Sequence, residues 1–292
     1  MTVVLDGGLA TELEARGHDL SGELWSARLL ADDPAAIVAA HRAFFRAGAR
    51  IATTASYQAS LGGFAELGLD SGEAVRLLEL SVELAREARV TGDELVAASI
   101  GPYGATLADG SEYRGRYGLT VAELTAFHRP RAEILAAAGP DLLACETVPD
   151  VDEAEAMLLA IEGLGVPAWL SYTIEGGSTR AGQPLTEAFS VARGNDQIVA
   201  VGVNCCDPRD VAVAARIARE ASGKPVIAYP NSGETWDARA RRWTGQARFS
   251  PEAVRDWLAA GVEYVGGCCR VRPDDIAALA AVVTPGGGSP PA

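Results

Sequence analysis

The stretch IVAVGVNCC, residues 198–206, carries the clearest indication of the architecture. Its first six residues are apolar or glycine, so both faces of a strand built from them would be buried, and it ends in an asparagine and two cysteines. Strands that are buried on both faces are typical of parallel sheets covered by helices. The stretch therefore predicts a parallel strand with reactive side chains at its C-terminal end.

Runs of the same kind recur along the whole chain. Seven more can be read: TVVLD (2–6), ARIATTAS (49–56), ELVAASIG (94–101), DLLACET (141–147), AWLSYTI (168–174), PVIAYPNSG (225–233) and VEYVGGCC (262–269). Segments with helical spacing lie between them, several starting at Asp, Ser or Thr and ending at Gly: 33–49, 72–90, 120–139, 150–165, 207–223 and 250–261, with a last helix near 274–282. This alternation predicts an α/β fold, a single (β/α)8 TIM-type barrel, with a doubly wound open sheet as the alternative.

We expect one barrel domain at residues 1–284, because no linker-like stretch interrupts the alternation. The tail at 285–292, PGGGSPPA, has the composition of a disordered segment.

Composition excludes several classes of partner. The chain has 292 residues, 48% of them hydrophobic, and 39 acidic against 25 basic side chains give a net charge of -14. Such a charge argues against nucleic acid and against anionic membrane surfaces as partners.

The N-terminus lacks the features of a signal peptide, and no apolar run is long enough to span a bilayer, so we expect a cytoplasmic protein. In that reducing compartment its five cysteines are expected to be thiols, catalytic groups or metal ligands. The oligomeric state cannot be predicted.

The unusual residues follow the strands. In a barrel of this kind, function lies at the C-terminal face, where strands end and the following loops begin. The predicted strand ends carry DGG (6–8), TTASYQ (53–58), GPYG (101–104), CET (145–147), NCC (204–206), YPNSGE (229–234) and GGCC (266–269). We therefore expect their polar groups to converge on one rim.

Three of the cysteines can meet there. Cys205 ends one predicted strand and Cys268 and Cys269 end another, about two strand–helix units later, so inward side chains of the two strands can share a layer. Neighbouring residues of a regular strand point to opposite faces, so the pair can reach one ion only if the chain bends, and Gly266 and Gly267 supply that freedom. Three thiolates would leave a fourth position of Zn²⁺ open. Core packing, or a redox pair, stays open as an alternative from spacing alone.

The motifs together resemble one enzyme family. LDGGLATELEARG, TTASYQAS, GPYGATLADGSEYRG, AFHRPR, LLACETVPD, GVNC, YPNSGE and VGGCCR occur in the order found in the homocysteine S-methyltransferases, and most resemble the bacterial and plant enzymes that use S-methylmethionine. The likeness covers roughly residues 2–283. It implies a barrel with catalytic Zn²⁺ held by Cys205, Cys268 and Cys269, with Cys206 a neighbour that could in principle replace Cys205, and Cys145 as packing near the site.

The resemblance also implies where substrates bind. Asp6 and Glu146 would hold the ammonium of homocysteine, and backbone amides at Gly7, Gly8 and Leu9 its carboxylate. Trp25 would lie on the side of the methyl donor, with Tyr57, Tyr103 and Tyr113 as weaker candidates. Asn231 and Glu234 would shape the rim or bind polar groups of the substrate.

The implied reaction is zinc-dependent methyl transfer from S-methylmethionine, or S-adenosylmethionine, to the thiolate of L-homocysteine, which forms methionine. A different thiol or selenol acceptor, or a betaine-type donor, would use the same machinery. A non-catalytic zinc-binding barrel is a more distant alternative, since metal binding alone requires neither Asp6, Glu146 nor Trp25. A metal-independent lyase or aldolase would predict a lysine at a strand end, and none of the predicted strand ends has one.

Overall fold

Eight parallel strands form a closed barrel. The computed structural model describes residues 2–20, 25–237 and 242–284, so the tail predicted to be disordered, 285–292, lies outside the described residues. The spatial order is β1-β12-β9-β8-β5-β4-β3-β2, and the two ends of this series meet through a parallel bridge between Leu5 and Ile51. The strands are β1 (Val3–Val4), β2 (Ile51–Thr53), β3 (Leu95–Ile100), β4 (Leu142–Val148), β5 (Ala168–Tyr172), β8 (Ile198–Asn204), β9 (Val226–Tyr229) and β12 (Val262–Val265). This confirms the predicted (β/α)8 barrel and excludes the open sheet.

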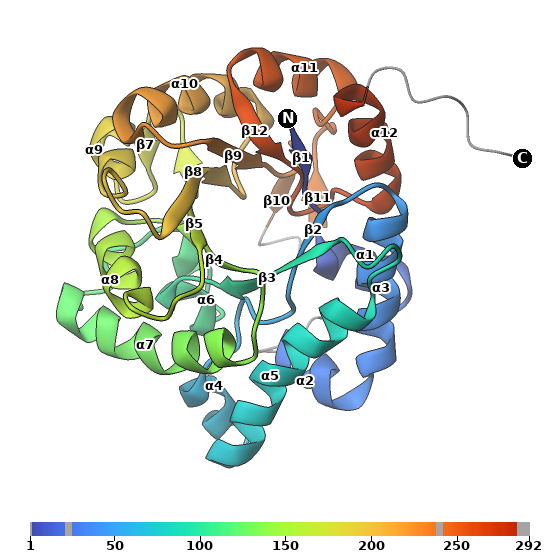
Figure 1. The fold of residues 1–292 in the computed structure, drawn as a ribbon, viewed down its shortest axis with the longest axis vertical. Coiled ribbons are helices and arrows are strands. Elements are labelled where there is room, and N and C mark those ends of the chain that lie inside the picture. The colour runs from blue at the N-terminus through green and yellow to red at the C-terminus, as the bar shows by residue number, and fades with distance from the viewer. Residues whose placement is uncertain (1, 21–24, 238–241, 285–292) are drawn as a thin grey trace, which may run out of the picture.

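Helices surround the strands, as Figure 1 shows looking down the barrel. The longer ones begin where the sequence predicts: at α5 and α7, Asp70 with Glu73 and Thr120 with Glu123 form reciprocal capping boxes. The helices are α1 (Leu9–Ala15), α2 (Trp25–Asp32), α3 (Pro34–Arg46), α4 (Leu61–Glu66), α5 (Ser71–Glu87), α6 (Tyr103–Thr106), α7 (Val121–Ala137), α8 (Val151–Ile161), α9 (Leu185–Ser190), α10 (Val211–Ser222), α11 (Pro251–Ala259) and α12 (Pro273–Val283), with 3-10 turns η1 (Ser111–Tyr113) and η2 (Pro208–Asp210).

Two separate apolar clusters explain why the strands are apolar on both faces. The larger one lies between strands and helices and includes Phe44, Leu78 and Val203. The smaller one fills the barrel interior and includes Ile51, Trp169 and Ile227. Each strand contributes alternate residues to the two clusters, which is the pattern that the sequence carries.

The structure differs from the predicted elements at a few places. The run 2–6 forms a strand only over Val3–Val4, because the next residue, Leu5, makes just one isolated bridge, with Ile51. The predicted helix at 207–223 is split: Asp207 caps η2, and α10 starts at Val211. Five short helices, α1, α2, α4, α6 and α9, were not predicted, because each has too few residues to show a clear period. The same holds for two antiparallel hairpins, β6 (Ile174–Glu175) with β7 (Ser178–Thr179) and β10 (Thr235–Asp237) with β11 (Arg242–Thr244).

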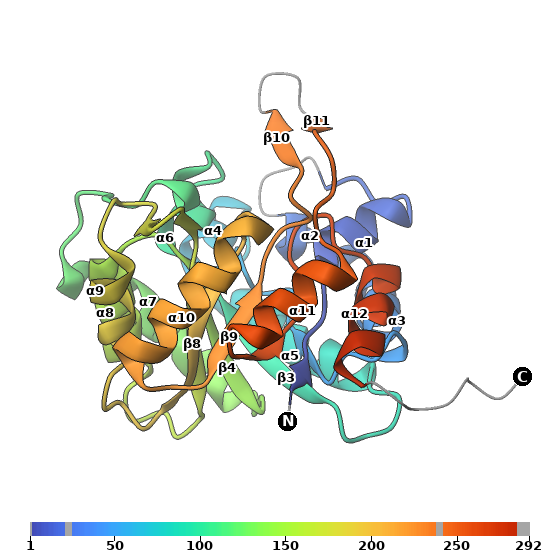
Figure 2. The same ribbon diagram turned by 90° about the horizontal axis from the view of Figure 1, so that it is seen from above.

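The loops at one end of the barrel are the elaborate ones. Seen from the side, the β10–β11 hairpin projects beyond the barrel on the same side as α1, α4 and α6, whereas β1 begins at the other end (Figure 2). This is the C-terminal face of the strands, where the sequence places the polar strand ends. Of the helices in the described ranges, none combines the length and apolar character needed to cross a membrane.

Candidate active site

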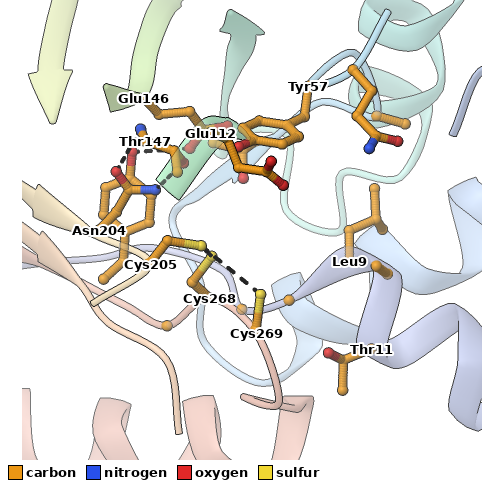
Figure 3. A pocket seen from close by; sticks show the side chains of 18 of the residues that line it. Leu9, Thr11, Tyr57, Glu112, Glu146, Thr147, Asn204, Cys205, Cys268 and Cys269 are labelled. Atoms are coloured by element: carbon orange, nitrogen blue, oxygen red, sulfur yellow. Dashed lines mark hydrogen bonds between the residues drawn. The ribbon is translucent and has the colours of Figure 1, made fainter. Parts of the chain in front are cut away.

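Three thiols meet at this face of the barrel. The Sγ atoms of Cys205, Cys268 and Cys269 all lie within 4.8 Å of one another. Cys205 Sγ is 2.7 Å from that of Cys268 and 3.9 Å from that of Cys269 (Figure 3). Hydrogen bonds from Cys205 and Cys268 lower the pKa of Cys269 well below that of an ordinary thiol, whereas the hydrogen bond with Cys205 raises the pKa of Cys268. Hydrogen bonds within the cluster therefore favour a thiolate among its members.

A turn after β12 brings the adjacent cysteines to the same side. Val271 N donates to Cys268 O at 3.1 Å, and Arg270 within this turn has the left-handed φ of 68°. The glycines before the pair act through space rather than through a positive φ. A Cβ on Gly266 would lie 2.7 Å from Asp6 O, and one on Gly267 2.2 Å from the side chain of Val271. The bend that the sequence predicts is present, but the two glycines serve close packing.

Cys205 has a strained backbone conformation, and hydrogen bonds of the preceding residue, Asn204, hold it in place. It directly follows β8 and has a φ of 49°, an uncommon conformation for a residue with a side chain. Asn204 Oδ1 accepts from Thr147 N at 2.7 Å and from Ser171 Oγ at 2.9 Å, and its Nδ2 donates to Thr147 Oγ1 at 2.7 Å. Thr147 itself has a φ of 59°. Strain held in place by a buried hydrogen-bond network is a feature that clusters at functional sites.

Glu146 is a buried acid that faces the thiols across the cavity. Its side chain lines the cavity, and Ser99 Oγ donates to one oxygen while Tyr229 OH donates to the other at 2.9 Å. Burial raises its pKa to about 7 although these two hydrogen bonds lower it. Tyr229 is fixed in turn by Trp169 Nε1 at 2.9 Å. The carboxylate is thus rigidly placed and lacks a cationic partner among the described residues.

Asp6 lies behind the cavity wall. Thr53 N donates to its Oδ2 at 2.8 Å and Thr53 Oγ1 to its Oδ1 at 3.0 Å, and Asp6 is absent from the residues that line the cavity, whereas Thr53 is present. Burial raises the pKa of Asp6 to about 8, and the charge of Glu146 adds to this rise. In this arrangement Asp6 orients Thr53 at the wall.

The other predicted residues have different surroundings. Gly7, Gly8 and Leu9 line the cavity, but the amide of Gly8 already donates to Val271 O at 2.9 Å. Leu9 begins α1, and first-turn amides lack intrahelical acceptors. Asn231 does not line the cavity: its Oδ1 accepts from Cys269 N at 3.1 Å, so it holds the cysteine turn. Trp25 starts α2, and its side chain lies outside the part of the structure that is described.

The two remaining cysteines and Glu234 do not join the thiol cluster. Cys145 and Cys206 are both buried in the larger apolar cluster between strands and helices. Burial raises the pKa of Cys145 to about 12. Glu234 accepts from Ser232 Oγ at 3.0 Å and from Arg270 Nε at 3.2 Å, which ties two loops of the rim together.

The cavity beside the thiols measures about 240 Å³. The thiols and Glu146 form part of its wall, and the segment after β3 adds Glu112 and Tyr113, with Tyr57 from the loop after β2. Tyr113 OH is 3.8 Å from Cys205 Sγ. Sequence reasoning singled out Tyr57 and Tyr113 only weakly and missed Glu112, Ser99 and Tyr229. A polar residue inside an otherwise apolar strand, as Ser99 is in AASI, was the available signal for one of them.

The thiols fit a single metal ion. A Zn–S distance of about 2.3 Å separates thiolates of a tetrahedral site by about 3.8 Å. The 3.9 Å between Cys205 and Cys269 matches this spacing, and the 2.7 Å between Cys205 and Cys268 requires these two sulfurs to part by about 1 Å. Thiolates are soft ligands, which favour zinc and other soft metals over magnesium or calcium. The cluster can therefore hold a metal, with its open side toward the cavity.

Several known proteins with similar sequences are homocysteine S-methyltransferases. The family model described as homocysteine S-methyltransferase matches residues 3–283. Homocysteine S-methyltransferase of Escherichia coli (strain K12) is 44% identical over 96% of this chain and 94% of its own length, and homocysteine S-methyltransferase YbgG of Bacillus subtilis (strain 168) is 43% identical over 96% and 93%. Homocysteine S-methyltransferase 4 of Zea mays is 43% identical, over 96% of this chain and 89% of its own.

A solved structure shares this fold along nearly the whole chain. The metallated form of the homocysteine methyltransferase MmuM from Escherichia coli superposes with a TM-score of 0.86 at 43% identity, and 96% of each chain is covered.

Proposed function

This chain belongs to the homocysteine S-methyltransferase family, and from that premise we propose that it transfers the methyl group of S-methylmethionine to L-homocysteine, with zinc held by Cys205, Cys268 and Cys269. The observation that carries the proposal is the thiol cluster beside a cavity that also contains the unpaired carboxylate of Glu146. A site that only binds a soft metal would not need such an acid. A substrate that is an amino acid with a thiol side chain requires both features, the metal site for its sulfur and the acid for its ammonium.

The metal has one task in this scheme. Cys205, Cys268 and Cys269 would hold the zinc ion, which would lower the pKa of the homocysteine thiol so that its thiolate is available at neutral pH. The soft thiolate set, without histidine, suits both zinc and a sulfur ligand.

The chain's own residues bind and orient the acceptor. Glu146, fixed by Ser99 and Tyr229, pairs with the ammonium of homocysteine, because a cation in a partly dry cavity needs a carboxylate partner. The first-turn amide of Leu9 supports binding of the substrate carboxylate. Asp6 acts through Thr53, which its carboxylate holds at the cavity wall.

The reaction moves a methyl group between two sulfurs. The electron pair of the homocysteine thiolate forms the new S–CH3 bond, and the pair of the breaking bond stays on the donor sulfur, which becomes a neutral thioether. Attack by an anion on a cation removes both charges, so a cavity that excludes water favours this step. The rings of Tyr57 and Tyr113 at the wall can position the sulfonium through cation–π contact, which is weaker than pairing with a carboxylate.

S-adenosylmethionine is the alternative donor. The resemblance of the sequence motifs to the S-methylmethionine enzymes supports that donor, and the test below supplies the two donors separately.

The test measures methionine formed from homocysteine by the zinc-loaded protein, with S-methylmethionine, S-adenosylmethionine and betaine supplied separately and a chelator-treated control. We expect turnover with S-methylmethionine that the chelator abolishes. Cys205→Ala, Cys268→Ala and Cys269→Ala should each lower bound zinc well below one ion per chain, and Cys206→Ala, the matched control, should retain it. Normal zinc content in Cys269→Ala, or turnover that survives complete zinc removal, would refute the proposal.

A further inference from the structure

Glu112 is an acid at the active site, and one of its two carboxylate oxygens has no partner. It belongs to η1, the 3-10 turn after β3, and lines the cavity beside the thiols. Its Oε2 is buried and has no hydrogen-bond partner, and no arginine or lysine whose side chain the structure describes forms an ion pair with it. In Figure 3 its carboxylate points into the space between the Tyr57 ring and the cysteines. A buried carboxylate without a partner is costly unless a ligand satisfies it.

The segment that carries Glu112 is held firmly. Gly104 packs against it so closely that a Cβ at this position would lie 2.5 Å from Glu112 N. On the other side, Arg116 N donates to Asp150 Oδ2 at 3.0 Å, and the guanidinium of Arg180 stacks 5.6 Å from the centre of the Tyr113 ring. The position of the carboxylate is therefore built into the fold.

The surroundings of Glu112 are negative. Burial raises its pKa to about 7, and the nearby charges of Cys205 and Asp109 contribute to the rise. A cation bound beside Glu112 in the cavity would stabilise its ionised form and offset the cost of its burial.

The methyl donor brings two positive charges to this cavity, a sulfonium and an ammonium. The sulfonium loses its charge as the methyl group leaves, so a carboxylate paired with it would stabilise the ground state more than the transition state and would slow the reaction. The ammonium keeps its charge throughout. A carboxylate paired with the ammonium contributes equally to both states and strengthens binding without this penalty.

We propose that Glu112 binds the α-ammonium of the methyl donor, as the counterpart of Glu146, which binds that of homocysteine. This inference rests on the proposed function, because it requires a donor that is an amino acid. It holds for S-methylmethionine and S-adenosylmethionine alike, since both carry an α-ammonium group. Betaine-type donors lack that group and would gain nothing from Glu112.

The experiment compares Glu112→Gln with the wild type, using zinc-loaded protein. We expect the KM for S-methylmethionine to rise about 10- to 100-fold, which is the range for losing a hydrogen bond to a charged group, with kcat, the KM for homocysteine and zinc content nearly unchanged. Glu112→Asp should recover part of the loss. Glu66→Gln, which changes an exposed acid that does not line the cavity, should behave as wild type.

A second compound distinguishes whether Glu112 binds the ammonium or the sulfonium of the donor. Dimethylsulfoniopropionate has a sulfonium and a carboxylate but no ammonium, and it can be measured as donor or as competitive inhibitor of S-methylmethionine. Glu112→Gln should change its constant less than about 2-fold if the ammonium is the partner. An equal loss with both compounds, a loss confined to homocysteine, or no loss at all would overturn the inference. The proposed function would fail differently, through a wild-type protein that turns over none of the donors.

Discussion

Glu146 is a buried acid whose ionisation the barrel opposes, and this makes acceptor binding depend on pH. Burial raises the pKa of Glu146 to about 7. Only the ionised carboxylate pairs with an ammonium, and its population grows as pH rises through the raised pKa. We therefore expect the affinity for homocysteine, measured by calorimetry, to increase as the pH rises from 6 to 8, with the steepest change near pH 7.

Glu146→Gln shows whether this acid is responsible. Removing the charge should weaken homocysteine binding by about 2 kcal/mol or more, roughly 30-fold, because it leaves a desolvated ammonium without its partner. The pH dependence between 6 and 8 should flatten at the same time. If the variant keeps the wild-type slope, the thiols rather than Glu146 control binding in this range. Glu66→Gln serves as the exposed control.

Single residues of the site could be predicted to different degrees from the sequence. Cys205, Cys268 and Cys269 stand at strand ends, and the barrel geometry brings strand ends together, so their convergence follows from topology. Glu112 could not be found in this way, because η1 lies in an irregular loop whose path depends on tertiary contacts such as that of Gly104. The position of Asp6 behind Thr53 is likewise a property of packing, which no spacing encodes.

At the scale of elements, the contact between β8 and β9 is unusually close. Gly202 in β8 lies opposite Ile227 in β9, and a Cβ on Gly202 would be 1.7 Å from Ile227 O. Gly202→Ala would push apart the two strands that support Cys205 and Tyr229. We expect a loss of at least about 3 kcal/mol of unfolding free energy, as overpacking against backbone cannot be relieved by a change of rotamer.

Urea unfolding checks this expectation against a matched variant. Gly177 lies in the turn between β6 and β7, and a Cβ at this position would have no atom within 4 Å, so Gly177→Ala should stay within about 0.5 kcal/mol of the wild type. Equal midpoints for Gly202→Ala and Gly177→Ala would mean that β8 and β9 can separate at little cost.

The regular elements were the most predictable part of the fold. All eight barrel strands and the capped helices α3, α5, α7, α8 and α11 were expected, because burial on both faces and helical spacing are local patterns that the packed barrel reinforces. Helix α9, with six residues, and the hairpins β6–β7 and β10–β11 carry too few residues for a period to appear. Helix α9 packs against α8 and α10, and such tertiary contacts leave no periodic pattern in so short a segment.

At the scale of the whole molecule, the net charge of -14 bears on the two substrates unequally. S-methylmethionine has a net charge of +1 when its carboxylate is ionised, whereas homocysteine is neutral overall. A negative protein field attracts the first and acts little on the second, and salt screens that attraction, with a Debye length of about 10 Å at 0.1 M. The field therefore favours the encounter with a cationic donor.

Ionic strength tests this consequence with the unmodified, zinc-loaded protein. Between about 10 mM and about 500 mM sodium chloride, we expect kcat/KM for S-methylmethionine to fall about 3-fold or more, because steered association weakens steeply as salt is added. At saturating S-methylmethionine, kcat/KM for homocysteine should change less than about 2-fold, which makes the neutral substrate an internal control for effects of salt on the fold or the metal. A parallel fall for both substrates would point to such a general effect. If kcat/KM stays constant for both substrates, the net charge of the protein does not influence how the donor enters the open end of the barrel.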